Sequence, residues 1–94
     1  MEEHEARLRK LRMRSWRRGI KEMDLILGPF ADSEIQAMSP ADLDLYEVFL
    51  NENDQDLYPW ITARFSGHHP GPAQFAALLD RVAVFARDRL AQKN

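Results

Sequence analysis

AQFAALLDRVAVFARDRL, residues 73–90, is the stretch that decides the fold. Its apolar side chains recur every three or four positions, which is the spacing of one face of an α-helix. These side chains are Phe75, Leu78, Leu79, Val82, Phe85 and Ala86. The spacing predicts a long amphipathic helix that begins near Pro72 or Ala73 and buries this face against the rest of the chain.

The first half of the chain also has the pattern of helices. Residues 2–15 contain neither Gly nor Pro and are rich in Glu, Arg, Leu and Lys, which favour helices. A second helix is expected to start near residues 17–19 and to kink or end at Gly28-Pro29. Ser39 followed by Pro40 predicts the start of a third helix, with Ser39 as its cap.

A fourth, short helix is expected around Leu57 and Ile61. Asp54 and Asp56 are candidate caps, and placing Pro59 in the first turn favours Asp56. No stretch shows the alternation of a strand. We therefore predict an all-α fold, a compact bundle of about five short helices. It forms one domain over residues 1–94, with flexible ends at about 1–5 and 91–94. We assign Phe49, Trp60, Leu79 and Phe85 to its core.

Composition limits the class of protein. A chain of 94 residues with 45% hydrophobic and 30% charged residues is long enough for one globular domain. The absence of cysteine excludes disulfides, thiolate metal sites and a catalytic thiol. No apolar run approaches the length of a membrane span. The first residues are acidic and lack an apolar segment, so we expect no signal sequence and a cytoplasmic location.

Charge is unevenly distributed along the chain. Residues 1–21 hold eight basic and three acidic residues, residues 22–63 hold ten acidic and no basic ones, and residues 64–94 hold five basic and two acidic ones. These segments carry +5, −10 and +3, which sum to the net charge of −2. Two interpretations stay open: the opposite charges pair inside the bundle, or they form a two-signed surface that steers a partner.

We find no pattern of a conventional active site. His68 and His69 are adjacent, but a metal site needs three or four matched ligands, so we interpret this segment as a solvated loop. The acidic pairs, such as Asp54 and Asp56, fit helix caps better than a catalytic cleft. A phosphate-binding glycine loop and a nucleophile elbow are also lacking. We therefore expect that the protein is not an enzyme.

The segment Arg17-Arg18-Gly19-Ile20-Lys21-Glu22 is the most informative one. On a helix, Arg18 and Glu22 would be four residues apart and could pair. A glycine inside a helix lowers stability by about 1 kcal/mol relative to alanine. The presence of glycine at position 19 therefore indicates a specific structural or functional role. It either forms a turn between two helices or leaves bare backbone for a partner to approach, and both roles are compatible.

With this segment the chain resembles a known family, the bacterial FAD assembly factor of succinate dehydrogenase (SdhE). Arg18, Gly19 and Glu22 match its R-G-x-x-E motif, and Asp24 and Phe30 follow at the expected offsets. The family's acidic D-x-D-L-x-x-W segment is matched by Asp54, Asp56, Leu57 and Trp60. The resemblance covers about residues 7 to 90. It implies an all-helical protein of about this length with five helices.

The resemblance implies a chaperone that binds the flavoprotein subunit of succinate dehydrogenase, with that of fumarate reductase as a further candidate client. The chaperone promotes covalent attachment of FAD to that subunit. The chemistry and the FAD belong to the client, so no stably bound cofactor and no metal are expected. We also expect no nucleic-acid partner, no membrane insertion and a monomer.

The residues that we assign to partner binding are Arg14, Trp16, Arg17, Arg18, Gly19, Lys21 and Glu22. In this hypothesis Gly19 permits close approach of the partner backbone, while Arg18 and Glu22 make charge-assisted contacts beside it. The other basic residues of the set steer association. Trp16 is either an interface anchor or part of the core.

Two alternatives stay open. The Arg-rich first helix could serve a nucleic-acid-binding or toxin-neutralising module, a role once suggested for relatives. The sequence pI of about 5.9 and the acidic middle segment argue against binding to phosphate. A small enzyme that uses the acidic cluster is the other alternative.

Overall fold

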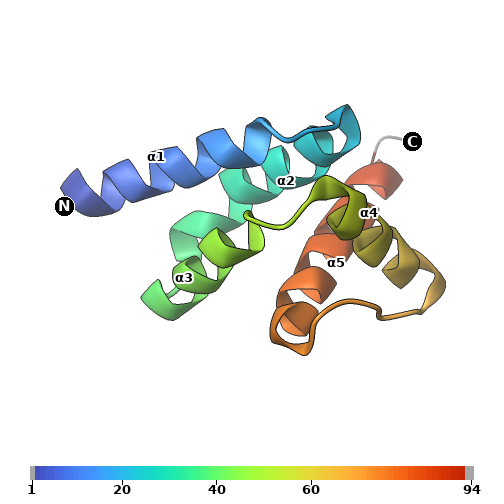
Figure 1. The fold of residues 1–94 in the computed structure, drawn as a ribbon. Helices are drawn as coiled ribbons and strands as arrows, with labels where there is room; N and C mark the ends of the chain where they lie inside the picture. The colour runs from blue at the N-terminus through green and yellow to red at the C-terminus, as the bar shows by residue number, and fades with distance from the viewer. Residues whose placement is uncertain (1, 93–94) are drawn as a thin grey trace.

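Five α-helices and three short 3₁₀ turns follow one another in the computed structural model, which describes residues 2–92 (Figure 1). The helices are α1 (Glu2–Trp16), α2 (Lys21–Glu34), α3 (Pro40–Phe49), α4 (Asp54–Ala63) and α5 (Ala76–Gln92). The 3₁₀ turns are η1 (Ile35–Ala37), η2 (Arg64–Ser66) and η3 (Ala73–Phe75). Within residues 2–92 there is no strand, so the predicted all-α bundle of five helices is confirmed.

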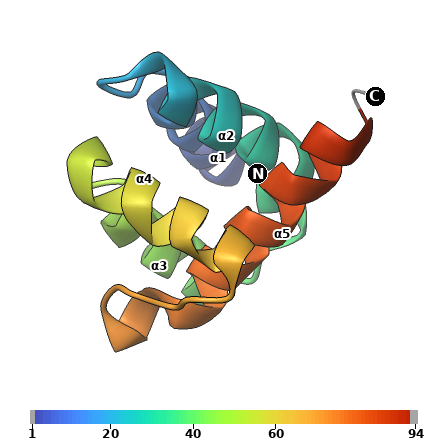
Figure 2. The same cartoon turned by 90° about the vertical axis from the view of Figure 1, so that its right-hand side faces the viewer.

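Four of the five helices form two pairs. Helices α1 and α2 lie side by side and run in opposite directions, joined by residues 17–20 (Figures 1 and 2). Helix α4 packs on α5, and α5 in turn crosses α2. The turn between α1 and α2 therefore lies at one end of the molecule, close to the start of α4 (Figure 1).

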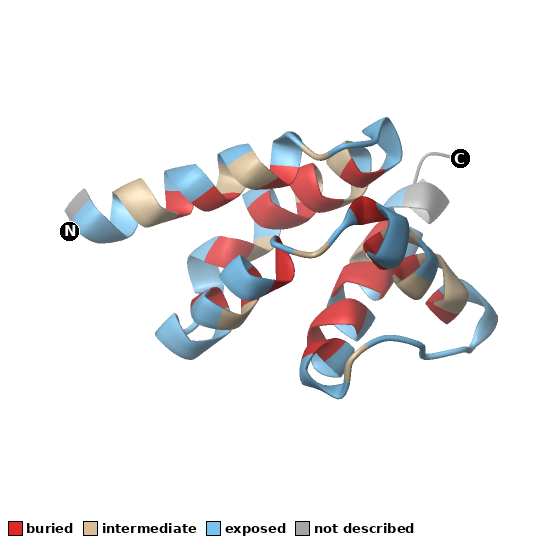
Figure 3. Ribbon diagram, viewed as in Figure 1, coloured by how far each residue is buried: buried red, intermediate tan, exposed pale blue. Residues whose placement is uncertain are grey.

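Apolar residues on the inner faces of all five helices form one core (Figure 3). A chain of aromatic rings runs through it, with centroids 5.8 Å apart between Phe30 and Tyr46 and 5.4 Å apart between Phe49 and Phe75. The predicted face of the last helix is buried as expected, Leu79 completely. Phe85 and Trp60, also assigned to the core, are partly buried against it.

The predicted cap of the third helix is confirmed. The backbone N–H of Asp42 donates to Oγ of Ser39 at 3.1 Å, and Pro40 occupies the first position of α3. A serine cap satisfies one of the free amides at a helix start, and proline loses nothing there because that amide has no partner within the helix. Local sequence was therefore sufficient to place this boundary.

The second helix differs from the prediction at both ends. Helix α2 begins at Lys21, after the expected start at 17–19, and it does not end at Gly28-Pro29 but continues to Glu34. A Cβ atom on Gly28 would lie 2.3 Å from Cδ2 of Trp16, so the indole ring of α1 lies directly on the backbone of α2 there. Packing against α1 outweighs the one backbone hydrogen bond that Pro29 cannot donate.

The fourth helix also begins earlier than predicted. Its first residue is Asp54, its N-cap is Asn53, and Pro59 lies inside the helix rather than in its first turn. Asp56 is therefore not the cap. The carboxylate of Asp54 is bound elsewhere, as described below, so neither acidic residue has the capping role that we assigned to it.

Both ends of the described chain are helical, since α1 begins at Glu2 and α5 ends at Gln92. The predicted flexible ends fall partly on residues 1 and 93–94, which lie outside the described residues, and that prediction stays open. None of the five helices combines the length and the apolar composition that crossing a bilayer requires.

Candidate functional site

The turn between α1 and α2 lies where the sequence motif predicted a site. Ile20 has an extended backbone, with φ −129° and ψ 148°, and caps α2. Its carbonyl oxygen accepts hydrogen bonds from the backbone amides of Met23 at 3.1 Å and Asp24 at 3.3 Å. These are the first hydrogen bonds of that helix. Residues 17–20 are therefore a defined connection and not a continuation of either helix.

A single carboxylate from the other half of the molecule binds this turn. Oδ1 of Asp54, the first residue of α4, accepts a hydrogen bond from Nε of Arg18 at 2.8 Å. Oδ2 accepts a hydrogen bond from the backbone amide of Ile20 at 3.1 Å and another from the backbone amide of Gly19. The side chains of Arg18 and Asp54 are only 9% and 8% exposed. The turn is thus held by a buried ion pair and two backbone hydrogen bonds.

Arg18 has further partners inside the molecule. Its Nη1 donates to the carbonyl oxygen of Leu50 and its Nη2 to that of Glu52, both at 2.7 Å. These carbonyls lie just past the end of α3, where a helix leaves acceptors free. The backbone amide of Arg18 donates to Oδ1 of Asp24 at 2.5 Å. One guanidinium therefore ties the turn to the α3–α4 connection.

This arrangement differs from the pairing that the sequence suggested. Arg18 and Glu22 could have paired on a helix, but the side chain of Arg18 is buried and its ion pair is with Asp54. A contact of Arg18 with a partner stays a prediction. The i,i+4 pairing fails because Arg18 precedes α2 instead of lying on it. Within the candidate site, Arg18 is thus a positioning residue, and Asp54, which we predicted as a helix cap, anchors the turn instead. The acidic D-x-D-L segment singled out this residue but did not indicate its partner in the turn.

Gly19 is exposed, so the backbone at this point is accessible to a partner. A Cβ atom there would lie 3.1 Å from Oδ2 of Asp54, closer than ordinary contacts. The lack of a side chain therefore lets the Asp54 carboxylate reach two consecutive amides. Of the two roles considered for Gly19, the turn is confirmed, and close approach of a partner stays a prediction.

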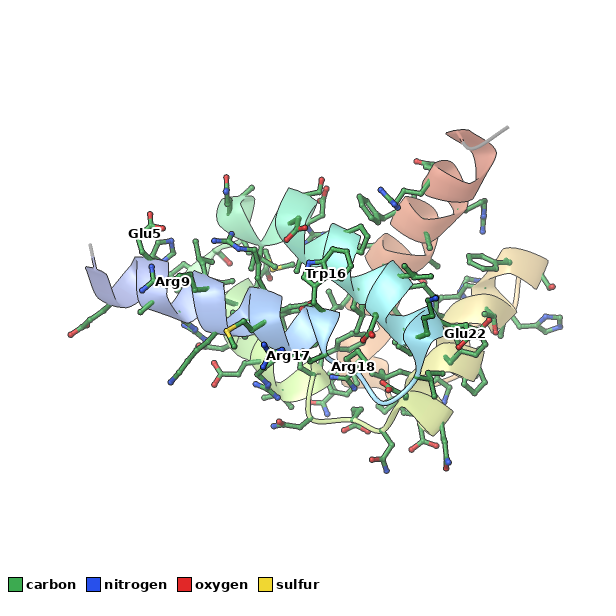
Figure 4. All side chains as sticks on the ribbon, turned by 90° about the horizontal axis from the view of Figure 1, so that it is seen from above. Glu5, Arg9, Trp16, Arg17, Arg18 and Glu22 are labelled. Carbon is green, nitrogen blue, oxygen red and sulfur yellow. The ribbon has the colours of Figure 1, made fainter. Side chains whose placement is uncertain are left out.

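Most of the other predicted site residues lie on the outside of this turn (Figure 4). Arg17, Lys21 and Glu22 are exposed. None of the three makes an ion pair or a side-chain hydrogen bond with any side chain that the structure describes. Arg14 is half-buried, and its Nη2 donates to Oδ1 of Asn51 at 2.6 Å.

Trp16 is packed on α2 in part, and its role as an interface anchor stays a prediction. Its ring packs on the backbone of Gly28, and its Nε1 donates to Oδ2 of Asp32 at 3.2 Å. The residue is nevertheless 41% exposed. One edge of the indole therefore secures α1 on α2, while the rest of the ring remains available on the surface.

The oppositely charged segments pair in part with each other, at the surface between helices. Arg7 of α1 contacts Asp44 at 2.6 Å and Glu47 at 3.1 Å, both on α3. Arg81 of α5 contacts Glu34 of α2 at 3.4 Å. Exposed pairs of this kind contribute little to stability. The described side chains of Arg17, Lys21 and Glu22 at the turn keep unpaired charges of both signs, so internal pairing is partial and steering of a partner stays a prediction.

Arg64 forms a second buried cationic contact. Its side chain is 3% exposed, its Nε donates to Asp80 at 2.7 Å, and its Nη1 donates to the carbonyls of Trp60 at 2.9 Å and Pro70 at 2.8 Å. The hydrogen bond from Arg64 lowers the pKa of Asp80. The bond to Pro70 fixes the loop that contains His69. No cluster of potential metal ligands is present among the described side chains.

The match to a family model covers both the turn and its Asp54 anchor. Residues 9–86 match the family described as "Flavinator of succinate dehydrogenase" (Sdh5). The chain belongs to this family. The family resemblance seen in the sequence is thereby confirmed at this level.

Relatives of this chain carry the name "Succinate dehydrogenase assembly factor 2, mitochondrial". The one from Saccharomyces cerevisiae is 35% identical over 82 residues, which are 85% of this chain and 50% of the yeast protein. The one from Meyerozyma guilliermondii is 38% identical over 64 residues, 68% of this chain and 47% of that protein. The one from Candida glabrata is 41% identical over 56 residues, 60% of this chain and 37% of that protein. The chain thus spans half or less of the length of these relatives.

Proposed function

We propose that this protein binds the flavoprotein subunit of succinate dehydrogenase and promotes covalent attachment of FAD to it. Family membership points to succinate dehydrogenase as the client. The observation that carries the proposal is the turn between α1 and α2, where exposed Gly19 and Glu22 are presented on a backbone that Asp54 and Arg18 hold from inside.

Such a turn fits a chaperone better than a catalyst. A protein that favours one conformation of its client needs a surface that binds that conformation more tightly than others. Binding of this kind requires a preorganised surface, because a flexible one would lose entropy on association. The buried Arg18–Asp54 pair supplies that preorganisation. We propose that the chemistry and the FAD belong to the client and that this chain neither catalyses the attachment nor holds FAD stably.

We also propose the finer features that the resemblance implies. The chain is of bacterial type, acts in the cytoplasm as a monomer, and has the flavoprotein subunit of fumarate reductase as a second client. The R-G-x-x-E motif of Arg18, Gly19 and Glu22 supports the bacterial type. Sedimentation, cell fractionation and pull-down with each flavoprotein test these features one by one.

The test of the proposed function is in-gel flavin fluorescence of the succinate dehydrogenase flavoprotein, produced with and without this chain. We expect the covalent flavin signal to fall strongly without it. Gly19→Arg should abolish the effect of the chain while circular dichroism still shows a folded helical protein, and Gln36→Arg at an exposed position of η1 is the matched control. An unchanged flavin signal in the absence of the chain would contradict the proposal.

Glu22→Ala provides a second variant that does not depend on how Gly19→Arg folds. Glu22 is exposed and makes no ion pair with any described residue, so its loss should leave stability unchanged and weaken client binding. The control is Glu47→Ala, which removes an equal charge on α3. Equal effects of the two variants would show that general charge matters and the motif does not.

The nucleic-acid alternative is weakened by the internal use of the basic residues. Arg7, Arg14 and Arg18 each contact groups within the bundle, which removes them from any phosphate-binding set. Electrostatic binding to nucleic acid falls steeply as salt rises. Absence of binding at low salt would remove this alternative.

A further inference from the structure

An apolar groove opens next to Glu22, between α2, α4 and α5. It has a volume of about 230 Å³. Leu25 of α2 and Phe65 of η2 border it and are 54% and 37% exposed. Ile26 and Tyr58, which pack on the core, also line it. Large apolar side chains exposed around one hollow are typical of a binding surface.

Two side chains of opposite charge line the groove. Glu22 does so from the first turn of α2, and Arg89 does so from α5. These two side chains make no ion pair with each other or with any other described side chain. Arg89 instead lies over the ring of Phe85, 5.9 Å from its centroid. An occupant with a basic group near Glu22 and an acidic group near Arg89 would complement both charges.

The size of the groove indicates what kind of group fills it. Sites for drug-sized ligands and cofactors have volumes of about 300–1,000 Å³. The groove is smaller, and it is bordered by carbon-rich side chains rather than by a phosphate-binding loop. It therefore suits one or two apolar side chains of a polypeptide, the kind of anchor on which interfaces depend.

We propose that this groove docks a segment of the flavoprotein client that carries a large apolar residue with a Lys or Arg beside it. This inference rests on the proposed function, since Glu22 belongs both to the motif and to the groove. The client is then held at two adjoining places, by its backbone at Gly19 and by an apolar anchor between Leu25 and Phe65. Two such contacts fix the orientation of the client on the turn, which one contact cannot do.

Photo-crosslinking identifies the occupant directly. Benzoylphenylalanine replaces Phe65, and in a control protein it replaces Val84, which is 53% exposed and lies on the other side of α5 beside Glu34 and Asp80. The probe is the flavoprotein subunit of succinate dehydrogenase from the same genome. We expect crosslinking from position 65 and none from position 84. The crosslinked peptide should contain a large apolar residue within a few positions of Lys or Arg.

Affinity measurements with charged substitutions give an independent test. Leu25→Glu should weaken binding of the flavoprotein by about tenfold or more, because it places a second carboxylate at an apolar anchor site. Val84→Glu introduces the same charge at an equally exposed position and should change binding less than about twofold. Circular dichroism should show both variants folded, since both positions are exposed.

The outcomes separate the inference from the proposed function. If the unmodified chain binds the flavoprotein and Leu25→Glu binds equally well, the groove is not the docking site, although the proposed function stands. If Leu25→Glu changes only the oligomeric state in sedimentation, a second copy of this chain fills the groove and the inference is overturned. If the unmodified chain binds no flavoprotein, the proposed function fails and the inference fails with it.

Discussion

Replacing Asp54 by asparagine tests the network that holds the turn between α1 and α2. Oδ1 of this carboxylate accepts a hydrogen bond from Nε of Arg18, and Oδ2 accepts hydrogen bonds from the backbone amides of Gly19 and Ile20. Asparagine keeps the shape but has one oxygen and one NH₂ group. Whichever way the amide is turned, its NH₂ group faces a donor, so either the guanidinium or the two backbone amides lose their acceptor.

The size of the effect follows from burial. Removing one member of a buried ion pair typically costs about 3–5 kcal/mol. Arg18 keeps two carbonyl acceptors, at Leu50 and Glu52, which limits the loss. We therefore expect Asp54→Asn to lower the free energy of unfolding by about 2–4 kcal/mol. Asp56→Asn, an exposed acidic residue in the same helical turn, should change the free energy of unfolding by less than about 0.5 kcal/mol.

Urea unfolding followed by circular dichroism measures this difference. With a slope of about 1 kcal/mol per molar urea, typical of a small domain, the midpoint should fall by about 2–4 M. Hydrogen exchange provides the local readout, because the amides of Gly19 and Ile20 lie in a turn and depend on Asp54 for protection. Equal midpoints for Asp54→Asn and Asp56→Asn, with unchanged exchange at these two amides, would refute the network.

Three further predictions concern the rest of the fold. Gly28→Ala places a methyl group where Cδ2 of Trp16 lies, so the ring should leave α2, its emission in a Trp60→Phe background should shift to the red, and stability should fall by about 1–3 kcal/mol. Burial raises the pKa of Tyr46 to about 12, from 10.0. The buried neutral phenol therefore contributes stability that is fully present below pH 10, and about 2–3 kcal/mol of it should be lost between pH 10 and 12 in alkaline unfolding experiments. Tyr46→Phe should remove that component of the pH dependence. Arg64→Met should release the loop over residues 67–72, seen as faster proteolysis there, with a loss of about 2 kcal/mol in urea unfolding.

Local sequence patterns were sufficient to predict the helices. The apolar face around Leu79 and the Ser39 cap were predicted correctly because each depends on residues within a few positions of one another. The prediction failed where a distant contact competed with a local preference. Pro59 and Gly28-Pro29 have the character of helix breakers, yet helices continue through them because their other faces are packed against the rest of the molecule.

In the candidate site, too, the sequence predicted some features and only the tertiary structure showed the others. The sequence alone located the motif and the exposed positions of Gly19 and Glu22, since a glycine between two helical segments marks a turn. Only the tertiary structure showed that Arg18 faces inward, because its partner Asp54 is 36 residues away in the sequence. The fold brings the start of α4 to the end of α1, and burial there favours an ion pair with two further hydrogen bonds from the guanidinium over a solvated arginine. Periodicity determines which faces are apolar, but only the packing of those faces decides which charges meet.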